Sequence, residues 1–350
     1  MSVYNGEDYL EETLESVLAQ TFKPWELIVI NDCSTDRTAE ILAQYAERDA
    51  RVKVFPNEVN LRLPTSLNRA IDLSSGKYIA RMDADDICTP DRLEKQYKFM
   101  EANPSVALSS CRFMTLKNGV YSSGGCGGRC DFEALRAMLL VTNPILHPGV
   151  IARAEIMREF KYDSTHTCTE DLELWTRLAK AGMEMAILPE YLLIYRLHDK
   201  QITSTTLEKQ HREVSKVQET YFEHLLGEMD EKQKEFYISG IYFKESADIK
   251  SFCELFEWAK AKNKERRLLS EDALSYAFFE MLAEYKRCGI SKKEVLFAMF
   301  RFNPMFVIKE LLRRKRAASR EGERCISAAE RMSLYQNGGT KVFPAFEKRG

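Results

Sequence analysis

The feature that most constrains this chain is an apolar run that ends in three carboxylates within four positions. Residues 78–82 have the pattern of a buried strand, Asp83, Asp85 and Asp86 follow at once, and a helix pattern opens at Asp91. Carboxylates held this close repel one another unless a cation or a donor-rich ligand lies among them. Oxygen ligands of this kind suit Mg²⁺ or Mn²⁺, which bridge to substrate phosphates. A polar turn that caps the following helix is the simpler alternative.

An earlier apolar run has the same organisation. Residues 26–30 form a continuous apolar segment, and the polar residues 31–36 follow it. In open α/β sheets, ligands bind at the carboxyl ends of the strands. Asp32, a carboxylate at the tip of this strand, can accept a hydrogen bond from a base imide or a ribose hydroxyl. Capping of the next helix by Ser34 or Thr35 is the simpler interpretation of the segment.

Strand and helix patterns alternate along the first half of the chain. Strands are expected at 26–30, 52–55, 78–82, 106–115, 146–152, 185–188 and 192–197, and helices at 8–20, 38–48, 64–73, 91–102 and from 169 onward. This alternation predicts an α/β fold with a parallel, doubly wound sheet. The five glycines of residues 117–130 predict a mobile loop.

Composition excludes several classes of protein. The chain has 350 residues, enough for one large domain and a smaller one. Its 51 basic and 53 acidic residues give no reason to expect nucleic acid as a partner, and no run is long enough for a membrane span or has the pattern of a signal peptide. The nine cysteines are mostly scattered, which predicts reduced thiols in a cytoplasmic protein. Cys126 and Cys130 lack a second ligand pair, so a glycine loop is favoured over a zinc site.

Two further segments carry polar residues at the ends of predicted elements. Glu170 and Asp171 open an amphipathic helix, a position that the helix dipole favours for any acid. Residues 195–198, Tyr-Arg-Leu-His, close the last predicted strand.

Five blocks of sequence together resemble the inverting family-two glycosyltransferases with the nucleotide-diphospho-sugar (GT-A) fold. In chain order and spacing they are Tyr4-Asn5-Gly6-Glu7, Asn31-Asp32-Cys33-Ser34, the 80–86 segment Ala-Arg-Met-Asp-Ala-Asp-Asp, Glu170-Asp171 and Tyr195-Arg196-Leu197-His198. The resemblance covers residues 1–200. It implies a Rossmann-like fold with a mixed, mainly parallel sheet flanked by helices, and a transferase that uses Mn²⁺ or Mg²⁺.

The resemblance also implies roles for single residues. Asp171 would be the catalytic base, and Asp83, Asp85 and His198 would serve the metal that bridges the diphosphate. The residues that would bind the nucleotide sugar are Tyr4, Asp32, Arg81, Asp83, Glu170 and Arg196.

Transfer of a sugar from a nucleoside diphosphate requires groups of the same kinds. Displacing a nucleoside diphosphate from an anomeric carbon needs the leaving charge neutralised, which a metal with Arg196 or His198 can do. A carboxylate such as Asp171 can take the acceptor proton on the opposite face of the sugar. A mechanism with a single base and no covalent intermediate predicts inversion at the anomeric centre.

Two departures from the resembled pattern stand out. Relatives begin with an apolar strand and a proline before the Tyr-Asn motif, whereas this sequence starts at Met1, so the first strand is expected to be missing or truncated. Arg62 stands where glycine is commoner, which predicts an altered loop or an extra cation for the donor.

The C-terminal part has helical patterns. They run over 207–226, 231–241, 250–261, 270–286 and 292–302. We expect a catalytic domain over 1–205, a helical region over 206–320 and a flexible tail over 321–350.

Residues 292–316 are aromatic-rich and carry eight basic and two acidic residues. Such a segment can lie in an anionic membrane interface, and it can equally be a core helix with a solvated basic end. The membrane alternative predicts a protein that is peripheral on the inner face of the plasma membrane.

The leading hypothesis is a metal-dependent glycosyltransferase that moves a sugar, from a UDP-sugar, to a cell-surface polysaccharide or lipid-linked glycan. A binding protein impaired in catalysis is an alternative if the first strand is lost. A metal-dependent phosphoryl-transfer enzyme is less favoured, because no lysine or phosphate-binding glycine loop is evident near Asp83.

Overall fold

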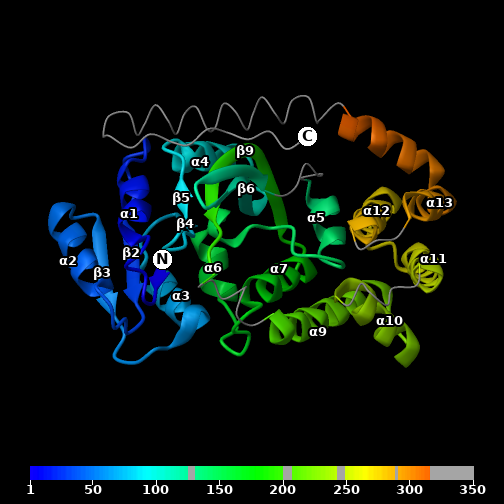
Figure 1. Cartoon of the computed structure of the whole chain (residues 1–350), viewed down its shortest axis with the longest axis horizontal. Helices are drawn as coiled ribbons and strands as arrows, with labels where there is room; N and C mark the ends of the chain where they lie inside the picture. The colour runs from blue at the N-terminus through cyan, green and yellow to red at the C-terminus, as the bar shows by residue number, and fades with distance from the viewer. Residues whose placement is uncertain (125–130, 200–206, 243–248, 288–290, 316–350) are drawn as a thin grey trace.

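The computed structural model describes residues 1–124, 131–199, 207–242, 249–287 and 291–315. An α/β part formed by the first half of the chain lies beside a helical part formed by the second (Figure 1). The predicted tail over 321–350 lies outside the described residues, and so does part of the loop expected at 117–130.

A parallel three-stranded sheet forms the N-terminal edge of the fold. Its order is β1-β2-β3, and its strands are β1 (Ser2–Val3), β2 (Leu27–Asn31) and β3 (Val52–Pro56). The connecting helices are α1 (Leu10–Leu18), α2 (Thr38–Arg48) and α3 (Arg62–Leu73). All five residues of β2 are buried, as a strand with helices on both faces requires. The first strand is short but pairs in register with β2.

A second, mixed sheet carries the remaining strands. Its order is β4-β8-β6-β9-β5, with β7 paired to β6, and its strands are β4 (Tyr78–Ala80), β5 (Ile87–Cys88), β6 (Val106–Lys117), β7 (Val120–Gly124), β8 (Ile151–Arg153) and β9 (Glu184–Arg196). Its helical elements are α4 (Arg92–Ala102), α5 (Phe132–Met138), η1 (His147–Gly149), α6 (Ala154–Phe160) and α7 (Glu170–Lys180). The predicted mixed α/β fold is confirmed, and its strands divide between two sheets.

The C-terminal end of β9 reaches the acidic residues because two predicted strands form a single one. β9 pairs parallel with β6, and the register moves from Cys111 opposite Leu188 to Arg112 opposite Tyr191. Pro189 and Glu190 are therefore bulged out of the ladder. Proline has no backbone N–H to donate, so a bulge lets the strand continue past it.

Two predicted segments differ from the structure. Residues 117–124 form a hairpin rather than a mobile loop, with Asn118 and Gly119 at φ 50° and 78° between β6 and β7. An Asn-Gly pair favours this two-residue turn because both central positions need positive φ. The predicted strand over 146–152 is instead the short helix η1 followed by β8, since Pro148 breaks the ladder.

Helices make up the described C-terminal part. They are α9 (Leu207–Leu226), α10 (Glu231–Tyr242), α11 (Ile249–Arg266), α12 (Glu271–Arg287) and α13 (Lys292–Phe302), and residues 304–315 are also helical. No described helix combines the length and the apolar composition that a bilayer crossing requires.

The two parts share one apolar core. Trp175 of α7 and Phe222 of α9 belong to the same buried cluster, which extends through α11, α12 and α13. The Tyr221 hydroxyl of α9 donates to the Arg136 carbonyl of α5 at 3.0 Å. The helical part therefore packs against the α/β part and stabilises it.

Phe222→Ala should lower the free energy of unfolding by about 3–5 kcal/mol, because its ring is buried between Tyr237 and Trp258. Phe297→Ala is the matched control: that ring is 72% exposed, so the change should stay within about 0.5 kcal/mol. Urea denaturation measures both, and equal losses would contradict the shared core.

Candidate active site

Three carboxylates converge on the turn that joins β4 to β5. The ligand oxygens of Asp83, Asp85 and Asp86 all lie within 4.8 Å of one another. Burial raises the pKa of Asp83 and raises that of Asp86 well above its usual range, and the neighbouring carboxylates raise both further. The site therefore concentrates negative charge that a bound cation would relieve.

The surroundings of Asp86 show whether these three carboxylates could hold a metal ion. Its side chain is fully buried, and its Oδ1 accepts from the Arg196 backbone N–H at 2.9 Å. Its Oδ2 has no hydrogen-bond partner within the described residues. A buried carboxylate oxygen without a donor is costly, and coordination of a divalent cation would satisfy it. The residues therefore fit Mg²⁺ or Mn²⁺.

Arg196 at the end of β9 and His198 just after it both contact the same turn. Arg196 Nε donates to the Asp85 carbonyl at 2.9 Å, and His198 Nε2 lies 3.0 Å from Asp85 Oδ2. The Arg196 guanidinium lies over the Tyr9 ring, 4.6 Å from its centroid, and pairs with Glu12. The fold thus brings Arg196 and His198 into contact with Asp85, which lies more than 110 positions earlier in the chain.

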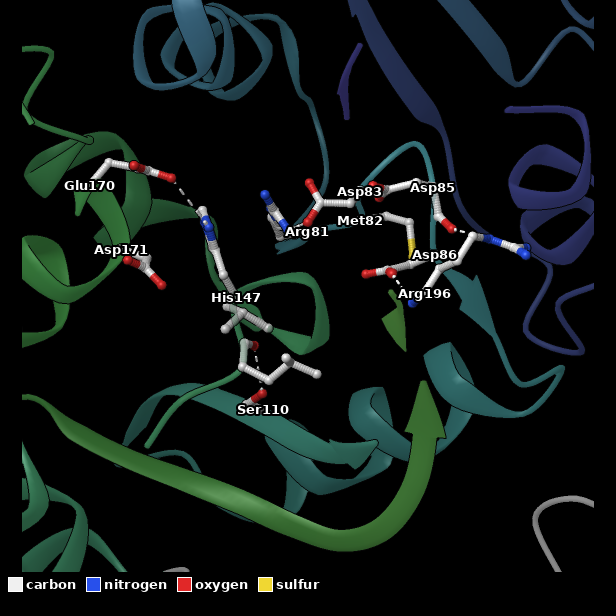
Figure 2. A network of polar contacts seen from close by, with 12 residues as sticks. Arg81, Met82, Asp83, Asp85, Asp86, Ser110, His147, Glu170, Asp171 and Arg196 are labelled. Carbon is white, nitrogen blue, oxygen red and sulfur yellow. Dashed lines mark hydrogen bonds and ion pairs between the residues drawn. The ribbon is translucent and has the colours of Figure 1, made fainter. Parts of the chain in front are cut away.

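Arg81 links the carboxylates to a second polar cluster. It follows β4, is 7% exposed and forms an ion pair with Asp83. In Figure 2 the Arg81 guanidinium lies between Asp83 on one side and His147 with Glu170 on the other. Its Nε has no partner in the described part of the chain. One buried cation therefore faces acids from two separate elements.

The second cluster surrounds the start of α7. His147 Nε2 lies 2.8 Å from the Tyr162 hydroxyl, and His147 Nδ1 lies 3.8 Å from Glu170 Oε1. Burial lowers the pKa of His147 well below its usual range, and the Arg81 charge lowers it further. Burial, with the charge of Asp171, raises the pKa of Glu170 to about 8. The imidazole is therefore neutral, and the Glu170 carboxyl is protonated at neutral pH.

Close packing fixes the position of His147. A Cβ added to Gly149 would lie 2.9 Å from Ser110 Oγ and 3.2 Å from Cys111 Sγ, so η1 is pressed against β6. The imidazole also meets the Trp175 ring edge-on, with centroids 5.8 Å apart. The glycine lets the turn approach the sheet closely, and the sheet holds the histidine beneath α7.

Asp171 lies at the start of α7 and is only partly covered. Its Oδ2 accepts from Asn143 Nδ2 at 2.7 Å, and its Oδ1 accepts from the Leu172 backbone N–H at 2.7 Å. Desolvation by its surroundings raises its pKa above the usual range. An oriented carboxylate with a raised pKa has the properties of a general base.

Asp32 and Tyr4 lie at the ends of the first sheet. Asp32 is buried, and its Oδ1 accepts from Asn57 Nδ2 at 2.6 Å and from the Leu61 backbone N–H at 2.8 Å. It therefore holds the loop between β3 and α3. Tyr4 is 53% exposed beside Asn5, whose Oδ1 accepts from the Thr35 backbone N–H at 2.8 Å. Their expected contacts with a nucleotide stay predictions.

Arg62 explains why the resembled pattern has glycine at this position. Its φ is 67°, in the left-handed region that glycine adopts without strain. Arg62 is the first residue of α3, and its side chain is exposed. The expected altered loop or extra cation for the donor stays a prediction.

Several site residues escaped prediction. Asn143, His147 and Tyr162 were not singled out, and Asp86 was not assigned as a ligand. His147-Pro148-Gly149 was a usable signal, because Pro and Gly together mark a tight turn that can present a side chain. Asn143 and Tyr162 lie in irregular segments without periodicity, and their proximity to Asp171 and His147 arises only in the folded chain.

Comparison with known proteins adds independent observations. The family model "Glycosyl transferase family 2" matches residues 1–157. An uncharacterized glycosyltransferase of Methanocaldococcus jannaschii is 32% identical over 60% of this chain and 73% of its own length. The amylovoran biosynthesis glycosyltransferase AmsE of Erwinia amylovora is 30% identical over 56% of this chain and 74% of its own length.

Solved structures share the fold. TarS of S. aureus, in complex with UDP-GlcNAc, has a TM-score of 0.55 at 17% identity and covers 88% of this chain and 90% of its own. The mannosyltransferase PcManGT of Pyrobaculum calidifontis, in complex with GDP-Man and Mn²⁺, has a TM-score of 0.50 at 16% identity, with 89% and 85% covered. The GT-A-like fold with a helical C-terminal region is therefore established.

Glu170→Gln should change how stability depends on pH. In the unfolded chain the carboxyl ionises near its ordinary pKa of 4.5, but in the folded protein only near 8. The free energy of unfolding contributed by this group is therefore lost as pH rises from about 4.5 to about 8. In metal-free buffer, the free energy of unfolding of the neutral glutamine variant should therefore rise relative to that of the wild type as pH increases over this range. The change should be on the order of a few kcal/mol.

Urea denaturation across that pH range measures the difference. Glu173→Gln is the control, because it removes a carboxylate from the same helical turn, where Glu173 pairs with Arg177. It shows how far the loss of a carboxylate that is not protonated by burial changes the pH dependence of stability. A Glu170→Gln difference that does not vary with pH would contradict the buried, protonated carboxyl.

Proposed function

Because the chain belongs to glycosyl transferase family 2, we propose that this glycosyltransferase transfers a sugar from a nucleotide-diphospho-sugar, a UDP-sugar, to a surface polysaccharide or a lipid-linked glycan. The sugar–phosphate bond of the donor breaks, and an acceptor hydroxyl forms the new glycosidic bond. The resemblance implies an inverting reaction.

One observation carries the proposal: two acidic clusters from different elements face the same buried arginine. Asp83 is in ion-pair contact with Arg81, and the Arg81 charge also acts on Glu170 and Asp171. A donor requires one group of residues for its diphosphate and another for the acceptor hydroxyl. The two clusters supply these chemistries on opposite sides of one cation.

The residues suited to the diphosphate end are those of the β4–β5 turn. Asp83 and Asp85, with His198, would hold Mn²⁺ or Mg²⁺, and the unpartnered Oδ2 makes Asp86 a further ligand. When bound, the ion would neutralise charge that develops on the leaving diphosphate. Arg196, fixed by Asp85 and Tyr9, provides an organic cation beside them.

The residue suited to the acceptor end is Asp171. Asn143 and the first turn of α7 orient its carboxylate, which accepts the proton as the acceptor oxygen attacks the anomeric carbon. Attack from the side opposite the leaving group inverts the configuration. Glu170, protonated and buried behind Asp171, leaves a single carboxylate free to act as base.

The substrate classes are drawn from related proteins. The structural neighbours TarS and PcManGT were solved with UDP-GlcNAc and with GDP-Man and Mn²⁺. Relatives are named for O-antigen and amylovoran biosynthesis. With a glycan of this kind, free or lipid-linked, as acceptor, we place the reaction in the cytoplasm at the inner face of the plasma membrane, with Tyr4 and Asp32 on the nucleotide.

Asp171→Asn should lower kcat for transfer by about 10²–10⁴-fold, because the amide cannot accept the proton. The donor Kd should stay within about twofold, since the amide keeps the shape of the side chain. Nucleotide release from a panel of nucleotide sugars, with calorimetry for binding, separates the two quantities. Asp72→Asn, which alters an exposed pair with Lys161, is the control. Unchanged turnover in the Asp171 variant would exclude it as the base.

Asp85→Asn should weaken donor binding in Mn²⁺ by at least about tenfold, because it removes a negative ligand and the partner of His198. Binding measured in EDTA should change little between variant and wild type. A loss of the same size in EDTA would mean that Asp85 contacts the donor without a metal.

A further inference from the structure

The outermost helices expose an unusual number of large apolar side chains. Among all the described residues, twelve such side chains are exposed, and six fall between positions 297 and 315: Phe297, Phe300, Met305, Ile308, Leu311 and Leu312. Soluble proteins rarely leave apolar groups this concentrated unless the surface binds something. We call residues 297–315 the basic apolar segment.

The opposite face of the segment is anchored in the core. Met299 and Phe302 of α13 are buried, as are Phe306 and Val307 of the helix over 304–315. The Phe302 ring lies 4.2 Å from that of Phe278 in α12, centroid to centroid. The core alternative therefore holds for one face of the segment, while the other face is apolar and exposed.

Charge on the exposed face has a single sign. Besides the apolar side chains and Pro304, the exposed residues are Arg301, Lys309 and Lys315. Glu310 is the one acid between 297 and 315, and it is buried and bonded to Arg313 at 2.7 Å and Arg314 at 2.8 Å. The face is therefore apolar and positive, with no exposed acid within the segment.

The spacing along the second helix puts these groups on one side. Met305, Ile308 and Leu312 stand at i, i+3 and i+7, and Lys309 lies beside them. A helix of this pattern can bury its apolar side chains at the headgroup level while its lysines reach anionic phosphates. Figure 1 shows α13 at the end of the helical part that lies away from β1–β3, so the segment is remote from the first sheet.

We infer that the basic apolar segment docks the enzyme on the surface of a bilayer that contains anionic phospholipids. The expectation that lipid-linked acceptors lie at such a surface rests on the proposed function, but the surface itself depends on none of the site residues. A second copy of this chain suits the face less well. A two-fold interface over residues 297–315 would bring like charges together, and this stretch has no exposed acid to pair with them; the exposed Glu294 of α13 lies outside it.

Vesicle flotation of the full chain tests the inference without any substrate. The wild type should float with vesicles of phosphatidylcholine and phosphatidylglycerol, and little should float with phosphatidylcholine alone. Phe297→Glu combined with Ile308→Glu should abolish flotation. Lys309→Gln should weaken binding roughly fivefold, the effect of one basic charge near an anionic surface. Leu73→Glu places the same charge at an exposed apolar position on α3, and this control should float like the wild type.

Three results would overturn the inference: no wild-type flotation with anionic vesicles, flotation that survives the double substitution, or an equal loss in the Leu73 control. Sedimentation of the free protein adds a fourth, a dimer that the double substitution dissociates. Donor binding by calorimetry should be unchanged in every one of these variants. If the proposed function is wrong, the calorimetry will show no donor binding. If only membrane docking is wrong, donor binding will be intact and the flotation result alone will fail.

Discussion

A single buried guanidinium balances the negative charge on which this site is built. Arg81 follows β4 directly, pairs with Asp83 and faces His147 and Glu170 on its other side. Without that cation, the acids at the β4–β5 turn and at the start of α7 would face one another across a low-dielectric interior. Burial lowers the pKa of His147 well below its usual range, and the Arg81 charge lowers it further. Arg81 therefore connects the two clusters of the candidate site.

The scaffold delivers these groups through long-range packing. β9 runs beside β6 for most of its length, bulges at Pro189 and ends with Arg196 bonded to Asp85 and Asp86. Gly149 lets η1 approach β6 closely enough to set His147 beneath α7. Trp175 then joins α7 to the core that the C-terminal helices complete. Packing contacts away from the candidate site thus determine where its polar side chains lie.

Much of this arrangement could be predicted from the sequence, and the reasons are local. The apolar runs before Asp32 and Asp83 identify strands and place acids at their ends, and the block at residues 195–198 matches a family pattern. The division into two sheets depends on pairings between distant strands, which no short pattern contains. The hairpin at Asn118-Gly119 carried a clear local signal that the surrounding glycines obscured. His147 and Asn143 acquire their roles only through contacts made by folding.

If both acidic clusters serve one reaction, a single donor molecule must reach both. The most direct measurement is a crystal structure of the Asp171→Asn variant with an intact UDP-sugar and Mn²⁺, in which anomalous scattering locates the metal. The ion should lie among Asp83, Asp85 and Asp86, and the anomeric carbon should face residue 171 with its phosphate bond pointing away. A donor whose sugar faces away from residue 171, or a metal bound elsewhere, would contradict the shared site.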